Sequence, residues 1–469
     1  MPLELANFAD RISKLERRRE ELLREVSDIE SQLSGERAAY NTLMNRQTSV
    51  YKLPAELLSH IFLLCQAAGP PLFYSSFAVA ASHVSRHWRT VSLSTPLLWN
   101  DIRVSKRIRH PLLRLEAHLS RSCDCFLDIL IDVLLSDIEP LLTLISGHSK
   151  RWRRFSLVTR YDHLVTVEKC LRYSSVPKLE HLSLLIGMSQ EHNSPRREYP
   201  EGCPMIFSEG APSLQLVRLG GLALGNLVPP TGMISTLDLG GFARYCMEPS
   251  QFVSFLQALP SLVNLSLSQP HVHYTRDVTK QVELPLLRSL RICGPHTFPL
   301  IPLSLLVLPK LESLILYEVE NFHSPVFPSV KELSLEACSF DEVAVTNMLH
   351  AFPSIAKLTM DPFIPAICSA INIYVGMPES SIPWPCLHTL TLRHIDAGDV
   401  VRLTGIVSVR YSSHAIQELR IGRRTRTVLR QKKLFNWFKK VVSIVNCDEP
   451  ETWPPGLGYD DPTDLVARS

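Results

Sequence analysis

The sequence lacks the features that mark secreted and membrane-spanning proteins. Its first residues, MPLELANFAD, contain no basic segment followed by an apolar run, so we expect no signal peptide. No apolar stretch reaches the roughly 18 residues that a membrane-spanning helix needs. The eleven cysteines include no CxxC pair, which favours free thiols in a reducing compartment. We therefore expect a protein of the cytoplasm, the nucleus or both.

Motifs of catalysis and cofactor binding are also missing. There is no glycine-rich phosphate loop, no GxSxG and no HExxH. His271 and His273 are spaced like two metal ligands, but no cysteine or acidic residue with ligand spacing follows them closely, so we interpret them as loop residues. Cys123 and Cys125 precede a predicted strand and suit packing better than redox chemistry. We expect a non-catalytic chain that needs neither metal nor cofactor.

The composition is that of an ordinary globular protein. Hydrophobic residues make up 45% of the 469 residues and charged residues 20%. The formal net charge of +3 gives no reason to expect nucleic acid or a membrane surface as a partner. The length suffices for several average domains or for one elongated repeat structure.

Residues 1–50 are predicted to form a long helix with one narrow apolar seam. Because a single seam is unstable alone in water, we expect it to pair with another chain, to fold back at Gly35 or to dock on the rest of the chain. The run Arg17–Arg19 is flanked by glutamates and is predicted to be a solvated helix face. The seam positions, of which eleven are apolar, are Leu5, Phe8, Ile12, Leu15, Arg19, Leu22, Val26, Ile29, Leu33, Glu36, Tyr40, Leu43, Gln47 and Val50.

The next segment, residues 51–102, is predicted to contain three short helices. The stretch "YKLPAELLSHIFLLC" begins a helix at Pro54, whose missing N–H suits a first helical turn. A second helix is expected at about 77–84, and a third contains Trp88 before "PLLW" closes the unit. About 50 residues are too few to bury all of these large apolar side chains internally. The excess predicts a partner surface.

The stretches "LPAELLSHIF", "VSRHWRTVSL" and "PLLW", in this order, resemble the F-box, the three-helix module that docks on the Skp adaptor of SCF ubiquitin ligases. The heptad helix and the long following region resemble fungal F-box proteins. One departure is the linker "QAAGPPLFYSSFAVA", which is longer than in the shortest F-boxes. In an alternative interpretation about half of the implied face is internal core, above all Leu58, Trp88 and Trp99. The resemblance implies an adaptor-binding face formed or supported by Leu53, Pro54, Leu57, Leu58, Ile61, Phe62, Val84 and Trp88.

From residue 150 onward the chain repeats an octet, Pro-x-Leu-x-x-Leu-x-Leu. Its alternating leucines predict a strand with a buried face, and we expect Leu290 and Leu314 to lie in the core. The stretches 250–259 and 341–352 are predicted helices between strands, and "CFLDILIDV" (125–133) is the first predicted strand. The octet starts with proline at 177, 212, 260, 285, 309, 328, 353 and 385, and without it at 150, 232 and 414.

One strand and one helix cannot bury their own apolar face, whereas a stack of such units can. The octets resemble the leucine-rich repeat family in a divergent form, because the usual asparagine of that family is absent. The resemblance implies an α/β fold with a leucine-rich-repeat-like solenoid over 121–447, preceded by the F-box and the long heptad helix. Residues 103–120 are the expected bridge, and 448–469 an expected mobile, acidic and proline-rich tail. A flat α/β domain with a conventional sheet is the alternative.

The densest charge cluster is "RIGRRTRTVLRQKK", residues 420–433. It is interpreted either as solvated surface or as a contact for an acidic or phosphorylated substrate, while the near-neutral total charge disfavours nucleic acid. Its basic residues are Arg420, Arg423, Arg424, Arg426, Arg430, Lys432 and Lys433.

These features together predict the substrate-recognition subunit of an SCF-type E3 ubiquitin ligase. The F-box would hold the Skp adaptor, and through it a cullin, while the repeats bind a protein substrate. No membrane partner is expected. The alternative is a non-enzymatic F-box scaffold that binds its partner without ubiquitination.

Overall fold

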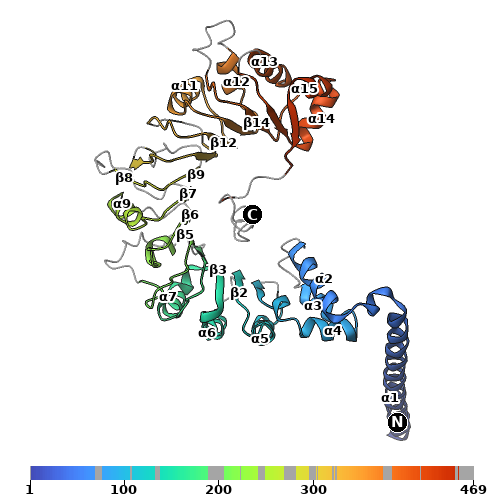
Figure 1. Ribbon diagram of the computed structural model, residues 1–469. Helices are drawn as coiled ribbons and strands as arrows, with labels where there is room; N and C mark the ends of the chain where they lie inside the picture. Colours follow the sequence, from blue (N-terminus) through green and yellow to red (C-terminus); the bar gives the residue numbers. More distant parts are fainter. Residues whose placement is uncertain are drawn as a thin grey trace. The chain divides into compact units, whose positions relative to one another are not determined.

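The computed structural model divides the chain into two compact units (Figure 1). Unit 1 comprises Met1–Asn100 and His118–Cys125, and unit 2 comprises Asp101–Ala117 and Phe126–Ser469. The structure describes residues 2–68, 77–105, 108–132, 138–187, 205–221, 223–240, 249–268, 281–294, 303, 305–319, 322, 325–372, 383–411, 414–448 and 453.

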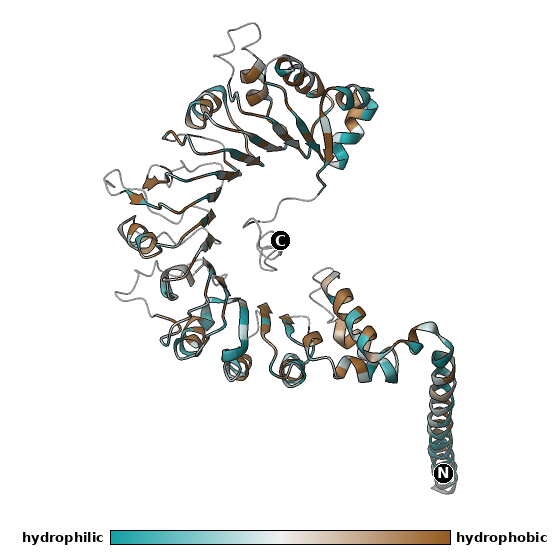
Figure 2. Ribbon diagram, viewed as in Figure 1, coloured by the Kyte–Doolittle hydropathy of each residue, from teal (hydrophilic) through white to brown (hydrophobic). Residues whose placement is uncertain are grey.

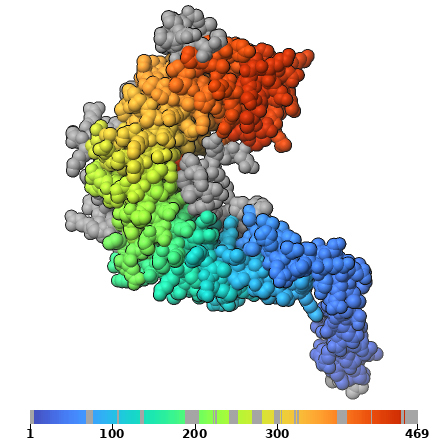
Figure 3. All heavy atoms as spheres, viewed as in Figure 1, coloured from blue at the N-terminus to red at the C-terminus, as the bar shows by residue number. Residues whose placement is uncertain are grey.

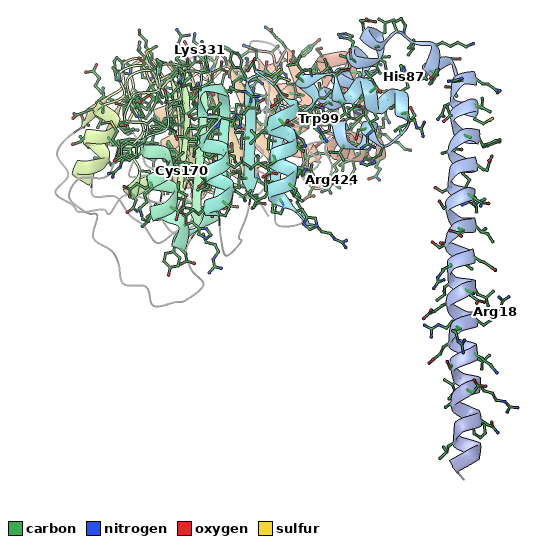
Figure 4. All side chains as sticks on the ribbon, turned by 90° about the horizontal axis from the view of Figure 1, so that it is seen from below. Arg18, His87, Trp99, Cys170, Lys331 and Arg424 are labelled. Atoms are coloured by element: carbon green, nitrogen blue, oxygen red, sulfur yellow. The ribbon has the colours of Figure 1, made fainter. Side chains whose placement is uncertain are left out.

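Unit 1 begins with the long helix that the heptad seam predicts. Helix α1 (Pro2–Gln47) runs unbroken for 46 residues and passes straight through Gly35. The predicted option of a fold-back at Gly35 is therefore wrong. The seam is exposed along the helix, with Leu15 at 71% and Leu43 at 61% exposure. In Figure 3 the atoms of α1 form a column one helix wide, and in Figure 4 its side chains, including Arg18, project around the whole helix.

Three short helices follow at the positions that the sequence predicts. Helix α2 starts directly after Pro54, and Ser85 caps α4 by accepting a hydrogen bond from the backbone N–H of Trp88 at 3.1 Å. The helical elements of this region are η1 (Ser49–Lys52), α2 (Ala55–Ala68), α3 (Phe77–Ser82), α4 (Arg86–Leu93) and η2 (Pro96–Leu98).

Unit 2 is built on a 14-stranded parallel sheet whose strands are neighbours in the order in which they occur in the sequence. Strands β8 (Val282–Glu283) and β10 (Leu306–Val307) form a separate pair. The strands of the large sheet are β1 (Asp101–Ser105), β2 (Leu127–Asp132), β3 (Trp152–Arg160), β4 (His181–Gly187), β5 (Leu216–Gly221), β6 (Thr236–Gly240), β7 (Asn264–Ser268), β9 (Ser289–Cys293), β11 (Ser313–Tyr317), β12 (Glu332–Glu336), β13 (Lys357–Asp361), β14 (Thr389–Leu392), β15 (Glu418–Ile421) and β16 (Ser443–Asn446).

Helices connect many of the strands and lie along one face of the sheet (Figure 1). We call the opposite face the front face. The described helical elements are α5 (Pro111–Arg121), α6 (Glu139–Ser146), η3 (Ser149–Arg151), η4 (Tyr161–His163), α7 (Leu164–Arg172), α8 (Ala223–Asn226), α9 (Pro249–Gln257), α11 (Glu342–Ala351), α12 (Pro365–Asn372), α13 (Val400–Arg410), α14 (Arg423–Gln431) and α15 (Phe435–Val441).

Each octet ends in one strand of the sheet, from β3 to β15. The register aligns equivalent leucines, so that Leu290 pairs with Leu265 on one side and with Leu314 on the other. Both Leu290 and Leu314 are 0% exposed, and their predicted burial is confirmed. Strand β2 confirms the strand predicted at 125–133, but it is not the first strand of the sheet, because β1 precedes it. Strand β1 forms where the sequence predicts only the end of the F-box and a bridge.

The chain is thus a mixed α/β protein with a long N-terminal helix and a large parallel sheet. Among the described helices, none is long and apolar enough to cross a membrane.

Gly220, near the end of β5, is pressed against the neighbouring strand. A Cβ atom at this position would stand 2.5 Å from the carbonyl oxygen of Gly240 and would also collide with the side chain of Leu185. The backbone of Gly240 cannot move away from this Cβ atom without disturbing the sheet. At Gly240 itself a Cβ would meet nothing closer than the Cβ of Ser268, at 3.4 Å.

We expect Gly220→Ala to lower the free energy of unfolding by about 1–3 kcal/mol, because the added methyl overpacks the β5–β6 contact. Gly240→Ala is the matched control and should change it by less than about 1 kcal/mol. Denaturant unfolding of the full-length variants measures both values. Equal values for the two variants would show that the close approach at Gly220 does not limit the side chain there.

Candidate interaction surfaces

A small apolar core holds the three short helices of unit 1 together. The ring of Phe62 on α2 lies 5.7 Å from that of Phe77 on α3 and 4.8 Å from that of Trp88 on α4, measured between centroids. One side chain therefore ties all three helices to each other. The buried members of this core are Leu58, Phe62, Ala78, Ala81, Val91, Leu98 and Trp99.

Trp99 lies in the core of the three short helices. Its Nε1 donates a hydrogen bond to the carbonyl oxygen of Ser92 at 2.8 Å, so its polar atom is satisfied within the core. The guanidinium carbon of Arg121 lies 4.4 Å from the ring centroid, and the ring of His118 meets it edge-on at 5.1 Å. The indole is thus fixed on several sides and is 0% exposed.

Helix α2 also carries an apolar stripe that faces solvent. Leu57, Ile61 and Leu64 follow one another at spacings of four and three residues, which places them on one side of the helix. They are 54%, 41% and 57% exposed, although Leu58 and Phe62 beside them are each 1% exposed. Figure 2 shows α2 as the most uniformly hydrophobic helix of unit 1. We call these three residues the α2 stripe, and contiguous exposed apolar surface is a common feature of interaction sites.

The structure divides the residues of the predicted adaptor-binding face into two sets. The interpretation that some of these side chains belong to the internal core is confirmed for Leu58 and Trp99. Leu64 is exposed as well, although the predicted adaptor-binding face did not include it. The buried and half-buried members are Leu53, Leu58, Phe62 and Trp88. The exposed members are Pro54, Leu57, Ile61 and Val84.

Adjacent leucines of α2 allow the division to be tested. We expect Leu58→Ala to lower the free energy of unfolding of unit 1 by about 2–5 kcal/mol, because it leaves a cavity under Phe62. Leu57→Ala should change it by about 0.5 kcal/mol or less, since that side chain is already in water. Denaturant unfolding of the full-length variants followed by near-ultraviolet circular dichroism measures both. A Leu57→Ala variant as unstable as Leu58→Ala would contradict the assignment.

On the front face of the sheet, a continuous row of mostly polar side chains runs across the strands. In each strand the residue of this row stands between the two apolar residues of Leu-x-Leu, which point to the opposite face. The residues of this row take the variable position of the terminal Leu-x-Leu, and each pairs in register with the same position of the next strand. We call them the front row. Its members from β3 to β15 are Ser156, Ser183, Arg218, Asp238, Ser266, Arg291, Ile315, Ser334, Thr359, Thr391 and Arg420.

Four members of the front row form a buried charge cluster, which we call the arginine platform: Arg218, Asp238, Ser266 and Arg291. The Oδ2 atom of Asp238 lies 3.3 Å from Arg218 Nε and 3.4 Å from Arg291 NH2. Arg291 Nε also donates a hydrogen bond to Ser266 Oγ at 2.9 Å. The three charged side chains are only 7–13% exposed. Two guanidinium groups therefore surround one carboxylate in nearly dry surroundings, where charge–charge interactions are little screened.

A second charge cluster follows the ends of β12, β13 and β14. Arg393 NH1 lies 3.5 Å from Glu336 Oε1 and 3.7 Å from Asp361 Oδ2, and the Arg393 side chain is 9% exposed. His394 Nδ1 lies 2.5 Å from Asp361 Oδ1. The sheet thus carries one nearly dry charge cluster and a second that is partly exposed, an arrangement suited to choosing a partner by charge complementarity.

The predicted basic cluster is divided between a strand and a helix. Arg420 belongs to the front row and pairs with Glu418 in the same strand. On α14, Thr425 and Leu429 face the protein, and the half-buried Arg426 donates to the side-chain oxygen of Asn446. The exposed members are Arg423, Arg424, Arg430, Lys432 and Lys433.

The residues considered for metal or redox chemistry lie only partly within the described residues. His271 and His273 lie outside the described residues, and no group of three or more possible metal ligands occurs within the described part of the chain. Cys123 is exposed and Cys125 is half-buried, and neither forms a disulfide. Burial raises the pKa of the Cys338 thiol to about 12, so this thiol stays protonated at neutral pH and is a poor nucleophile.

Reasoning from the sequence missed the arginine platform. A signal for it was present, because the variable position of Leu-x-Leu holds arginine in "VRL" and "LRI" and aspartate in "LDL". What the sequence could not supply was the strand order that brings Arg218, Asp238 and Arg291 together.

Neither a protein-family model nor the sequence of a curated protein matches this chain. Its function must therefore be inferred from its own residues and geometry. The two surfaces that stand out are the α2 stripe in unit 1 and the front row with its charge clusters in unit 2.

Proposed function

We propose that this protein is the substrate-recognition subunit of an SCF-type E3 ubiquitin ligase. The observation that carries the proposal is the exposed α2 stripe, on a helix whose other side packs into the core around Phe62. A small helical unit that exposes such a stripe is suited to docking on a partner through it. The order of α2, α3 and α4 supports the F-box resemblance of residues 51–102, so we assign the stripe to the Skp adaptor, and through it to a cullin.

We assign the sheet of unit 2 to a leucine-rich-repeat-like solenoid rather than to a flat α/β domain. Each octet supplies one strand, and consecutive octets are neighbours in the sheet. Repetition of one unit in one direction is what a solenoid requires. A conventional doubly wound sheet instead reverses its strand order at a switch point.

The mechanism in this proposal is proximity without catalysis. The F-box binds the adaptor, and the front row with its charge clusters binds a substrate protein. Two binding sites on one chain raise the effective concentration of substrate lysines near the ubiquitin-conjugating enzyme. No bond needs to form or break on this chain, and we place the activity in the cytoplasm, the nucleus or both.

The alternative is a non-enzymatic F-box scaffold, which binds the adaptor and a partner without ubiquitin transfer. Both proposals share the docking of the α2 stripe. They differ in the fate of the protein held on the front face. Ubiquitin transfer to that protein in a reconstituted complex supports the ligase, whereas stable capture without transfer supports the scaffold.

The seam of α1 adds a further expected contact. Its apolar side chains are exposed within unit 1, and a narrow seam of this spacing is the form that pairs with another helix. We therefore propose that residues 5–50 pair with a helix of another chain.

We expect the double variant Leu57→Asp, Ile61→Asp to lose binding to the Skp adaptor. Each apolar side chain buried at an interface contributes about 1.5–3 kcal/mol, so the loss of two should weaken binding at least about 100-fold. The measurement is co-purification with the adaptor, followed by calorimetry. Both side chains are exposed in the free chain, so the fold should persist.

Val165→Asp is the matched control for this experiment. Val165 lies on α7 in unit 2 and is 57% exposed, so it receives the same charge on an equally exposed apolar position. Adaptor binding should be unchanged in this variant. Undiminished binding of the Leu57→Asp, Ile61→Asp variant would remove the main support for the F-box proposal.

The basic residues of α14 are tested by charge reversal. We expect Arg423→Glu with Arg424→Glu to weaken salt-sensitive binding of acidic or phosphorylated partners about tenfold, because charged hydrogen bonds to them are lost. Acidic residues suit the first turn of a helix, so α14 should remain folded. Affinity capture at stepped salt concentrations measures the effect. Arg17→Glu with Arg18→Glu on α1 is the control, and an unchanged set of partners would identify α14 as ordinary solvated surface.

A further inference from the structure

Trp453 follows the last strand, β16, in a region that the sequence predicts to be mobile. Its side chain is nevertheless almost fully buried, with 8% exposed. The indole Nε1 donates a hydrogen bond to Ser289 Oγ on β9 at 3.4 Å. The guanidinium carbon of Arg291 lies 4.5 Å from the centre of the ring, which is a cation–π contact with the most favourable of the aromatic side chains. Both the polar atom and the π face of the tryptophan are therefore engaged.

The arginine that receives the ring is fixed by its neighbours. Arg291 donates to Ser266 at 2.9 Å and lies 3.4 Å from the carboxylate of Asp238, which Arg218 holds from the other side. These partners come from three adjacent strands of the sheet, β5, β6 and β7. The guanidinium plane is thus oriented before any ring arrives, which lowers the entropic cost of binding one.

The charges of the platform and of the segment around Trp453 are complementary. The platform combines two arginines with one aspartate, so it keeps an excess positive charge with little exposure to water. The segment "CDEPETW" (447–453) contains three acidic residues and no basic one. Asp448 of this segment also accepts a hydrogen bond from the backbone N–H of Arg423 at 2.7 Å. An acidic segment with a tryptophan is therefore the ligand chemistry that this surface fits.

We propose that the arginine platform is a recognition site for a tryptophan within an acidic protein segment. Trp453 fills the site in the free chain, and an acidic, tryptophan-bearing segment of a partner protein takes its place on binding. The inference rests on the proposed function, in which the front face binds a partner. A tether of a few residues gives Trp453 an effective concentration of about millimolar at the platform. In the intact chain Trp453 therefore competes with the partner's segment for the same site.

The test uses the full-length chain and a fluorescein-labelled peptide of residues 447–458 that carries Cys447→Ser. Fluorescence anisotropy measures peptide binding to the wild-type chain and to Trp453→Ala. We expect Trp453→Ala to bind the peptide at least about tenfold more tightly than the wild type, because the competing side chain is gone. The same peptide with its tryptophan replaced by alanine should lose at least about tenfold in affinity for Trp453→Ala.

Two further substitutions, each combined with Trp453→Ala, locate the binding. Arg291→Ala should weaken peptide binding at least about tenfold, because it removes the cation under the tryptophan ring. Arg402→Ala is the matched control, since Arg402 on α13 also pairs with a carboxylate, that of Asp399, but lies outside the front row, and it should leave the affinity unchanged. Ser289→Ala removes the indole's acceptor without touching a charge, and it should weaken binding severalfold even if Arg291→Ala fails to fold.

Equal peptide affinity in the wild type and in Trp453→Ala would overturn the proposal, and so would the absence of binding to Trp453→Ala at about 1 mM peptide. Binding that survives loss of the peptide's tryptophan would show only a general attraction of acidic chains and would also overturn it. The assay contains neither adaptor nor ubiquitin. Failure of this site therefore leaves adaptor binding by the α2 stripe intact, and failure of the stripe leaves peptide binding intact.

Discussion

The structure of unit 2 depends on one constraint, which is that a single octet cannot bury its own leucines. Each leucine is buried only when the neighbouring strands on both sides supply an equivalent apolar residue in register. Leu290, between Leu265 and Leu314, shows this arrangement, and all three are 0% exposed. The repeating leucines therefore specify both the burial and the order of the strands from β3 to β15, and β1, β2 and β16 extend the sheet beyond the octets.

Because the leucine columns determine the fold, the residues between them can differ from strand to strand. The front row accordingly holds serine, threonine, isoleucine, arginine and aspartate at equivalent positions. Charges in nearly dry surroundings persist only when they are paired, which is why Arg218 and Arg291 share Asp238. The leucines thus provide the stability of unit 2, and the variable positions of the octet are free to carry the specificity that we propose for it.

The same distinction explains how far the sequence predicts the fold. The octet signal is local, and every octet correctly predicts a strand. Strands β1 and β16 were not predicted, because neither contains the octet and both join the sheet by pairing with a neighbouring strand. The burial of Arg410 was not predicted either. It is 0% exposed at the end of α13 and donates to the carbonyl of Trp384 at 3.0 Å, and its burial lowers its pKa to about 10.

The candidate sites were less predictable than the fold, because long-range contacts decide them. Leu57 and Leu58 are adjacent and identical in chemistry, and only the arrival of Phe77 and Trp88 against Phe62 determines which leucine faces inward. Trp453 and Ser289 lie 164 residues apart in the sequence, beyond the reach of any periodicity. A hydrophobic pattern therefore predicts which elements form, whereas the side that remains open to a partner is decided only when distant elements pack together.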